Sequence, residues 1–134
     1  MSQTVQSGLT DVTGVVQTTA ATTALSNIIY LQKAGAGTST VGTVPANKRW
    51  LIISIDFSAV TAGGAAAQAY LELNNKKVIY CYPTSTATAP GIEHASLVFN
   101  LEACPILTAA QTINITSSAS ITANVCVSYI EESV

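Results

Sequence analysis

Apolar segments rich in β-branched and aromatic residues alternate with turn residues along most of this chain. In the clearest segment, residues 48–60, large apolar side chains occupy alternate positions, with Ser54 and Asp56 between them. The apolar set is Leu51, Ile53, Ile55 and Phe57. A period of two places one set on the buried face of a β-strand and the other set towards solvent.

A tight hairpin is predicted in the middle of the chain. Asn74 and Asn75 separate two apolar segments, residues 69–73 and 76–82. A two-residue loop of residues that tolerate positive φ indicates a β-hairpin. Residues 83–91 then form a loop of Ser, Thr, Pro and Ala residues.

The last third of the chain continues the strand pattern. We expect Leu97, Phe99 and Leu101 on one face of the strand that follows the loop. In the final strand the residues on one face are Ile121, Ala123, Val125, Val127 and Tyr129. No segment sustains helical periodicity over ten residues, so we predict an all-β protein of seven or eight strands, with little or no helix, folded as a sandwich or barrel.

A chain of 134 residues is expected to form one domain with a single core. Residues 1–25 consist mainly of Thr, Ser, Gln and Gly with scattered valines, and show no clear period. We therefore predict an N-terminal arm over residues 1–25 and a β-sandwich domain over residues 26–134.

The composition adds a surface with few charges. Only 9% of the residues are charged, against about 25% in typical proteins, and Ala, Thr and Ser supply more than a third of the chain. Monomeric proteins normally carry many surface charges that keep them apart, so the pattern favours self-association over a neutral monomeric domain. Five basic residues cannot build a phosphate-neutralising face, so direct nucleic-acid binding is not expected.

Targeting signals and cysteines suggest where the chain is made. The first residues lack a basic region and an apolar stretch, and no apolar run is long enough to span a bilayer, so we expect synthesis in a cytoplasm. Cys81, Cys104 and Cys126 lack metal-ligand spacing and are expected as buried small residues. A Cys81–Cys126 bridge is the alternative, if the two strands adjoin.

Catalytic chemistry has little support in the sequence. Glu93 and His94 form the single place where a carboxylate and an imidazole adjoin, but neighbours on a strand point to opposite faces. We therefore predict no enzyme activity, no catalytic residues, no metal site and no cofactor.

Two groups are candidate ligand or interface residues. Lys48, Arg49 and Trp50 could form a small phosphate or sugar site, or the polar start of a strand with a Trp covering one end of the sandwich. The second group, Tyr70, Tyr80 and Tyr82, could line a carbohydrate groove or pack in an interface or core.

Three segments resemble a known class of proteins. Residues 44–54, VPANKRWLIIS, are similar to the strand that opens many small viral and bacteriophage structural proteins. Residues 107–115 and 125–131 look like their last two strands, so the resemblance covers residues 26–132. Two departures are Ala109-Ala110 where such proteins commonly carry Gly, and the absence of Lys and Arg from residues 1–32.

The resemblance implies a single jelly-roll β-sandwich of about eight strands in a virion protein of the capsid, spike or tail-fibre type. Our leading hypothesis is a subunit that self-assembles into a capsid shell or capsid-associated oligomer, as a trimer, pentamer or larger ring. Its expected partners are itself and other virion proteins, with an internal membrane as a candidate contact and the virion as its location. The alternatives are a receptor- or carbohydrate-binding module of a spike or fibre, and a cellular β-sandwich.

Overall fold

The computed structural model describes residues 27–61, 67–83, 90–119 and 121–134, so the predicted arm of residues 1–25 lies outside the described residues. The described ranges contain nine strands and no helix, hence none that could cross a membrane. The strands are β1 (Asn27–Ala34), β2 (Gly37–Thr43), β3 (Lys48–Thr61), β4 (Ala69–Leu73), β5 (Lys76–Cys81), β6 (Gly91–Val98), β7 (Ile106–Thr108), β8 (Thr112–Ser117) and β9 (Ile121–Ser133).

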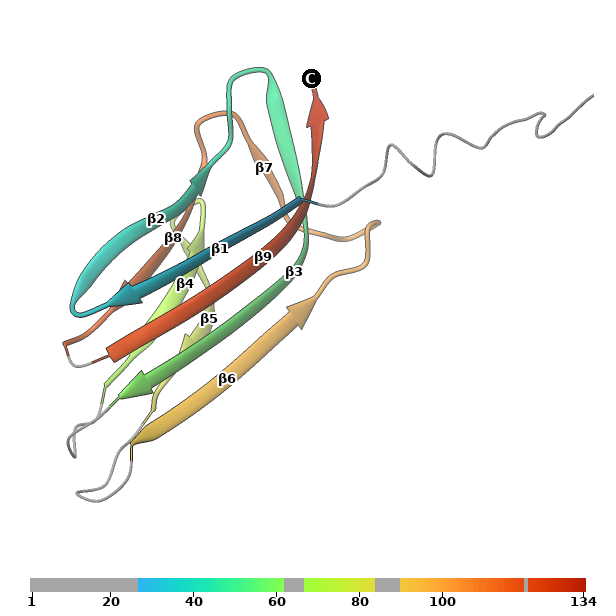
Figure 1. The fold of residues 1–134 in the computed structure, drawn as a ribbon. Coiled ribbons are helices and arrows are strands. Elements are labelled where there is room, and N and C mark those ends of the chain that lie inside the picture. Colours follow the sequence, from blue (N-terminus) through green and yellow to red (C-terminus); the bar gives the residue numbers. More distant parts are fainter. Residues whose placement is uncertain (1–26, 62–66, 84–89, 120) are drawn as a thin grey trace, which may run out of the picture.

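The strands form two antiparallel sheets that face each other (Figure 1). Sheet A has the order β1-β9-β3-β6, with the short β7 also pairing with β3, and sheet B has the order β2-β8-β4-β5. Without β7 the pairing is nested, because the first strand pairs with the last, the second with the second-last, β3 with β6 and β4 with β5. This is a jelly roll, so the predicted fold class is confirmed.

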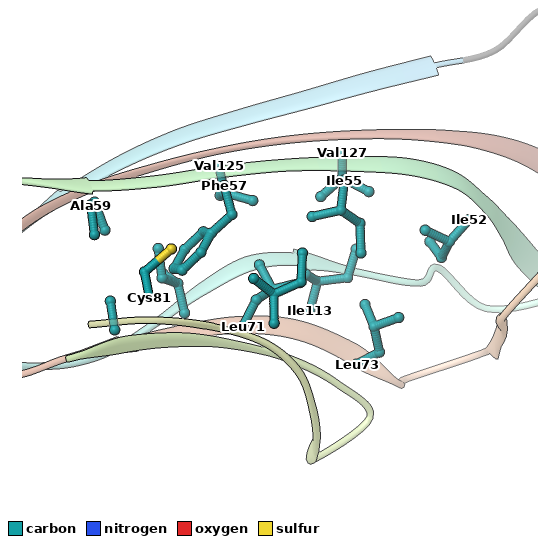
Figure 2. Close-up of a cluster of buried hydrophobic side chains, with 14 of the residues drawn as sticks. Ile52, Ile55, Phe57, Ala59, Leu71, Leu73, Cys81, Ile113, Val125 and Val127 are labelled. Atoms are coloured by element: carbon teal, nitrogen blue, oxygen red, sulfur yellow. The ribbon is translucent and has the colours of Figure 1, made fainter. Parts of the chain in front are cut away.

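The core lies between the two sheets (Figure 2). Alternate residues of β3 and β9 point inwards from sheet A and meet alternate residues of β4, β5 and β8 from sheet B. Fully buried members of this core include Ile55, Phe57, Val125, Val127, Leu71, Ile113 and Ile115. The polar residues between these core positions point outwards, so Thr and Asn side chains cover the outer faces of the sheets.

A β-bulge in β3 corrects one prediction. The register of β3 against β9 shifts between Ile52 and Ser54, so Ile53 is an extra residue. The shift reverses the alternation before it, and Trp50 and Ile52 are buried while Leu51 and Ile53 are only half-buried. The expected face of residues 51–57 is therefore right only after the bulge, because one inserted residue exchanges the two faces of a strand.

The strand after the central loop begins earlier than expected. β6 starts at Gly91, and Leu101 lies beyond it with 54% of its surface exposed. The Asn100 side chain accepts a hydrogen bond from the Glu102 backbone, and its carbonyl accepts one from Ala103. This local turn ends the strand, so Leu101 is not on the buried face.

The hairpin prediction is confirmed at Asn74 and Asn75. Their φ angles are 48° and 63°, as a type I′ turn requires, and they connect the paired strands β4 and β5.

The three cysteines are free, which overturns the alternative of a Cys81–Cys126 bridge. Cys81 points into the core from sheet B, whereas Cys126 alternates with core residues on sheet A and points outwards. Burial, and then the charge of Glu93, raises the pKa of Cys81 from 9.0 to about 11.

Candidate functional site

The six candidate residues fall into two groups on different sheets. Lys48, Arg49 and Trp50 begin β3 in sheet A. Tyr70 lies on β4, Tyr80 on β5 and Tyr82 just after β5, all in or beside sheet B. The two groups are therefore separate features of the surface.

The β3 group pairs residue by residue with the end of β9. Lys48 Nζ donates to Ser133 Oγ at 3.0 Å, and Arg49 forms an ion pair with Glu132 at 2.6 Å. Trp50 Nε1 donates to Glu131 Oε2 at 2.9 Å. Each polar group at the start of β3 thus has its partner on the neighbouring strand.

Trp50 is part of the core, with only 4% of its surface exposed. Its ring lies 4.2 Å from the ring of Tyr129, centroid to centroid, and a side chain added at Gly42 would come within 3.1 Å of it. Burial, followed by the charge of Glu131, raises the pKa of the Tyr129 hydroxyl. A ring enclosed in this way has no free face for stacking, so the geometry favours the structural interpretation of residues 48–50.

The tyrosine group lies on the outer face of sheet B. Tyr70 and Tyr80 are opposite each other in the register of β4 and β5, with ring centroids 6.0 Å apart. The rings of Tyr80 and Tyr82 are nearly parallel, 5.9 Å apart, and these two residues are 45% and 56% exposed. Three rings therefore form a continuous row at the β5 edge.

Lys77 adds a positive charge to this row. Its ammonium nitrogen lies 4.3 Å from the centre of the Tyr70 ring and 6.0 Å from that of Tyr80. The attraction of a cation to the face of an aromatic ring holds the lysine over the rings. The row combines aromatic surface, phenolic hydroxyls and one cation, which suits a neutral or acidic polar ligand.

Sequence reasoning missed a third group, on the outer face of sheet A. His94 Nε2 lies 3.0 Å from Asp56 Oδ1, beside a shallow hollow of about 160 Å³ that Tyr30, Asn124 and Cys126 help to line. Asp56 and His94 are 38 residues apart and come together through the pairing of β3 with β6. Only the nested strand order brings these two residues together, and a local sequence pattern does not reveal that order.

The chemistry of this third group is limited by its exposure. The side chains of His94 and Asp56 are 60% and 64% exposed, so water screens their interaction. Within the described ranges, no group of three or more His, Cys, Asp or Glu side chains could hold a metal ion.

Comparison with known proteins gives a structural match without a sequence match. No family model matches the chain, and no curated protein matches its sequence. The acidic stable capsid of Helicobacter pylori bacteriophage KHP30 is similar to it with a TM-score of 0.51 and 9% identity, over 82% of this chain and 94% of that one.

Two further structures share the arrangement more loosely. The capsid of cyanophage Pam1 has a TM-score of 0.43 and 10% identity, over 78% of this chain and 82% of that one. Bacillus endospore appendages, described as disulfide-linked pili, have a TM-score of 0.41 and 11% identity, over 82% and 88% of the two chains. Viral capsid proteins predominate among the similar structures. The strand order of the two sheets and the similarity to the KHP30 capsid confirm, at the level of the fold, the expected resemblance to jelly-roll viral structural proteins.

Proposed function

We propose that this protein is a structural protein of a virus particle, which self-associates into a capsid shell or a capsid-associated oligomer. The observation that carries the proposal is the scarcity of charged side chains on the outer surface of both sheets. The outward residues of β8 are Thr112, Asn114 and Thr116, and those of β9 include Thr122, Asn124 and Ser128.

An uncharged surface is suited to burial against another subunit. Desolvating an ion costs several kcal/mol unless it is well paired, whereas hydroxyl and amide groups can exchange water for partners at little net cost. On sheet B the hydroxyls of Thr38 and Thr116 already pair at 2.7 Å, so part of this surface is satisfied before any contact forms. Such faces can associate without a matching set of charges.

The fold supports the same proposal. The KHP30 structure that shares it is a bacteriophage capsid. In this proposal the subunits form closed trimers, pentamers or larger rings, because symmetric closed assemblies use one surface repeatedly. Other virion proteins are the further partners, an internal membrane is a candidate contact, and the virion is the location after synthesis in the host cytoplasm.

The arm of residues 1–25 is the segment that we propose is exchanged between subunits. Unpaired backbone groups of such a segment can complete the sheet edge of a neighbour. Deleting residues 1–25 should then lower the oligomer size while the sandwich stays folded.

Native mass spectrometry and electron microscopy of the purified full chain test the proposal. Rings or particles with a defined subunit number are the expected result. A monomer that persists at high concentration, and also in the presence of molecular crowding agents that promote assembly, would overturn it.

A second candidate function is recognition of a receptor or carbohydrate by the tyrosine row. The specific observation is that Tyr80 and Tyr82 stay exposed while stacked in parallel, with Lys77 beside them. A glycan array measures this directly, with Tyr80→Ala expected to remove binding. Tyr30→Ala, which changes an exposed tyrosine on the other sheet, should leave binding intact, and an array without any signal for the unaltered protein excludes this candidate.

A further inference from the structure

Besides the three-residue β7, the two described sheets have four edge strands, and three of these carry features that block pairing with another strand. β1 has the inward-pointing Lys33, which is only 8% exposed and whose ammonium group donates to the carbonyl of Gly35. β2 has a register shift between Thr40 and Gly42. β5 has two exposed lysines and a register irregularity against β4. Inward charges, bulges and lysines are the features by which sheet edges avoid each other.

β6 has only the weakest of these features: Glu93, opposite the buried Ala59, lies on the inward face like Lys33 but is exposed, and the strand has no lysine and no register shift. It forms the outer edge of sheet A in Figure 1, and its eight residues pair with β3 in uninterrupted register. It contains no Lys, Arg or Pro, and no described strand pairs with its outer side, although the Cys81 thiol at the end of β5 lies 4.0 Å from the Glu93 carbonyl oxygen. Ile92 and Val98 are 69% and 82% exposed on it. A long, regular and apolar edge of this kind favours pairing with another strand.

The two ionisable groups on β6 already interact within the chain. Glu93 Oε1 accepts a hydrogen bond from the backbone N–H of Tyr82, and His94 lies against Asp56. Neither side chain is therefore a free charge directed at an approaching strand.

The sequence of β6 is complementary to itself in one antiparallel register. Ile92 and Val98 lie three positions on either side of Ala95, so a two-fold axis at Ala95 places each Ile92 opposite Val98 of a second copy. Residues directly opposite each other in antiparallel strands share a face, and apolar β-branched pairs stabilise the sheet. The same register places His94 opposite Ser96.

The neighbouring same-face registers are less favourable. An axis at Glu93 would put two carboxylates opposite each other, and an axis at His94 would do the same with two imidazoles. Like charges directly opposite each other destabilise a strand pair, which disfavours the Glu93 axis. The His94 axis pairs Ile92 with Ser96, and an axis at Ser96 pairs Val98 with His94, so neither joins the two apolar residues. Only the Ala95 register joins the exposed apolar residues and separates the ionisable ones.

We propose that the β6 edge is a two-fold contact surface, where β6 of a second copy of this chain pairs antiparallel about Ala95 and joins the two A sheets into one. The inference rests on the self-association proposed above and names the surface that carries one of its contacts.

Cysteine cross-linking tests both the surface and the register. In a background where the partly accessible Cys104 and Cys126 are Ser, His94→Cys chains are mixed with Ser96→Cys chains under mild oxidation. Opposite Cα atoms in antiparallel strands are about 4.5–5.5 Å apart, within disulfide range. The mixture should cross-link rapidly, and each variant alone should not. Rapid cross-linking of His94→Cys alone, or none in the mixture, overturns the proposed register.

Two substitutions check the contact without cysteine. Val98→Lys should weaken the β6 contact on the order of tenfold or more, because it removes two apolar pairs per dimer. Ile28→Lys, on the opposite edge of the same sheet, is the matched control and should leave the contact unchanged. Equal effects of the two substitutions on the oligomer distribution would contradict a specific β6 contact.

The remaining outcomes separate this inference from the proposed function. Oligomers in native mass spectrometry without cross-linking overturn the β6 contact and leave self-association standing. A monomeric chain under all conditions overturns both. A cross-link that forms only after residues 1–25 are deleted would assign the edge to the arm of a neighbour and overturn pairing with β6 in the full chain.

Discussion

Ala110 adopts a backbone conformation that normally favours glycine. Its φ is 70°, and the Gln111 N–H donates to the carbonyl of Thr108 at 3.0 Å, which closes a four-residue turn between β7 and β8. Positive φ at the third position defines a type II turn, where glycine is preferred. The Ala109-Ala110 sequence therefore keeps the turn geometry at an energetic cost.

Replacing this alanine should stabilise the protein. We expect Ala110→Gly to raise the free energy of unfolding by about 1 kcal/mol, because glycine relieves the contact of Cβ with the backbone. Urea denaturation measures the change. Ala109→Gly is the control, since φ is negative there, and should destabilise by about 0.5–1 kcal/mol. A loss of stability in both variants would contradict the assigned turn.

The Cys81 thiol should make stability fall at high pH. Its pKa is raised from 9.0 to about 11 by burial and by the charge of Glu93. As pH rises above 9, the unfolded chain releases this proton whereas the folded chain retains it. The free energy of unfolding therefore falls between about pH 9 and 11. Unfolding free energies at pH 8 and 10.5 should differ less in Cys81→Ala than in the unaltered protein. An identical pH dependence would show that the thiol is not the responsible group.

The start of β3 and the end of β9 stabilise each other through three consecutive pairs. The pairs differ in burial, because the Trp50 indole is nearly enclosed whereas the side chains of Arg49 and Glu132 are 44% and 37% exposed. A buried hydrogen-bond donor that loses its acceptor costs free energy, because water cannot replace the acceptor. An exposed ion pair is screened by water and contributes less. The Trp50–Glu131 contact should therefore contribute most.

Two single substitutions test this ranking. Glu131→Ala should lower the free energy of unfolding by about 1–3 kcal/mol, because the indole N–H loses its acceptor. Glu132→Ala should cost less than about 1 kcal/mol. Chemical denaturation followed by the fluorescence of Trp50, the one Trp of the chain, gives both values. A larger loss for Glu132→Ala would reverse the ranking.

The sequence predicts elements well where the signal is local. Most strands and the Asn74-Asn75 hairpin follow from alternation and turn residues, because these depend on neighbours in the chain. The bulge at Ile53 was missed because Ile53 belongs to an apolar run, and the sequence pattern does not show which residue of that run is extra. The end of β6 was missed because the Asn100 turn interrupts an alternation that continues in the sequence.

At the scale of the whole molecule, scarcity of charge is the dominant property. The candidate residues of sheet B could be named from sequence because tyrosines on alternate positions of a hairpin share a face. The Asp56–His94 pair and the four sheet edges could not, since they depend on which strands adjoin. A jelly roll sets those neighbours through pairing of distant segments, which periodicity does not encode.

Assembly of such a surface should depend little on salt. We expect the oligomer distribution to stay the same between about 0.05 and 1 M sodium chloride, because screening at 1 M removes ionic contacts beyond about 3 Å and few are available. Ammonium sulfate should strengthen assembly through surface exclusion. Sedimentation velocity at each salt concentration measures the distribution. Dissociation by sodium chloride would indicate that ion pairs hold the subunits together.

The position of β9 has a consequence for the time course of synthesis. β9 lies between β1 and β3 in sheet A, although it follows all the other described strands in the chain. A nascent chain on the ribosome therefore leaves the facing edges of β1 and β3 unpaired until β9 emerges. Folding must follow translation of β9, and the long sequence separation between the paired strands makes that step slow. During this interval chaperones can bind the partly folded chain. The amount of available chaperone therefore helps to determine the yield of native subunits.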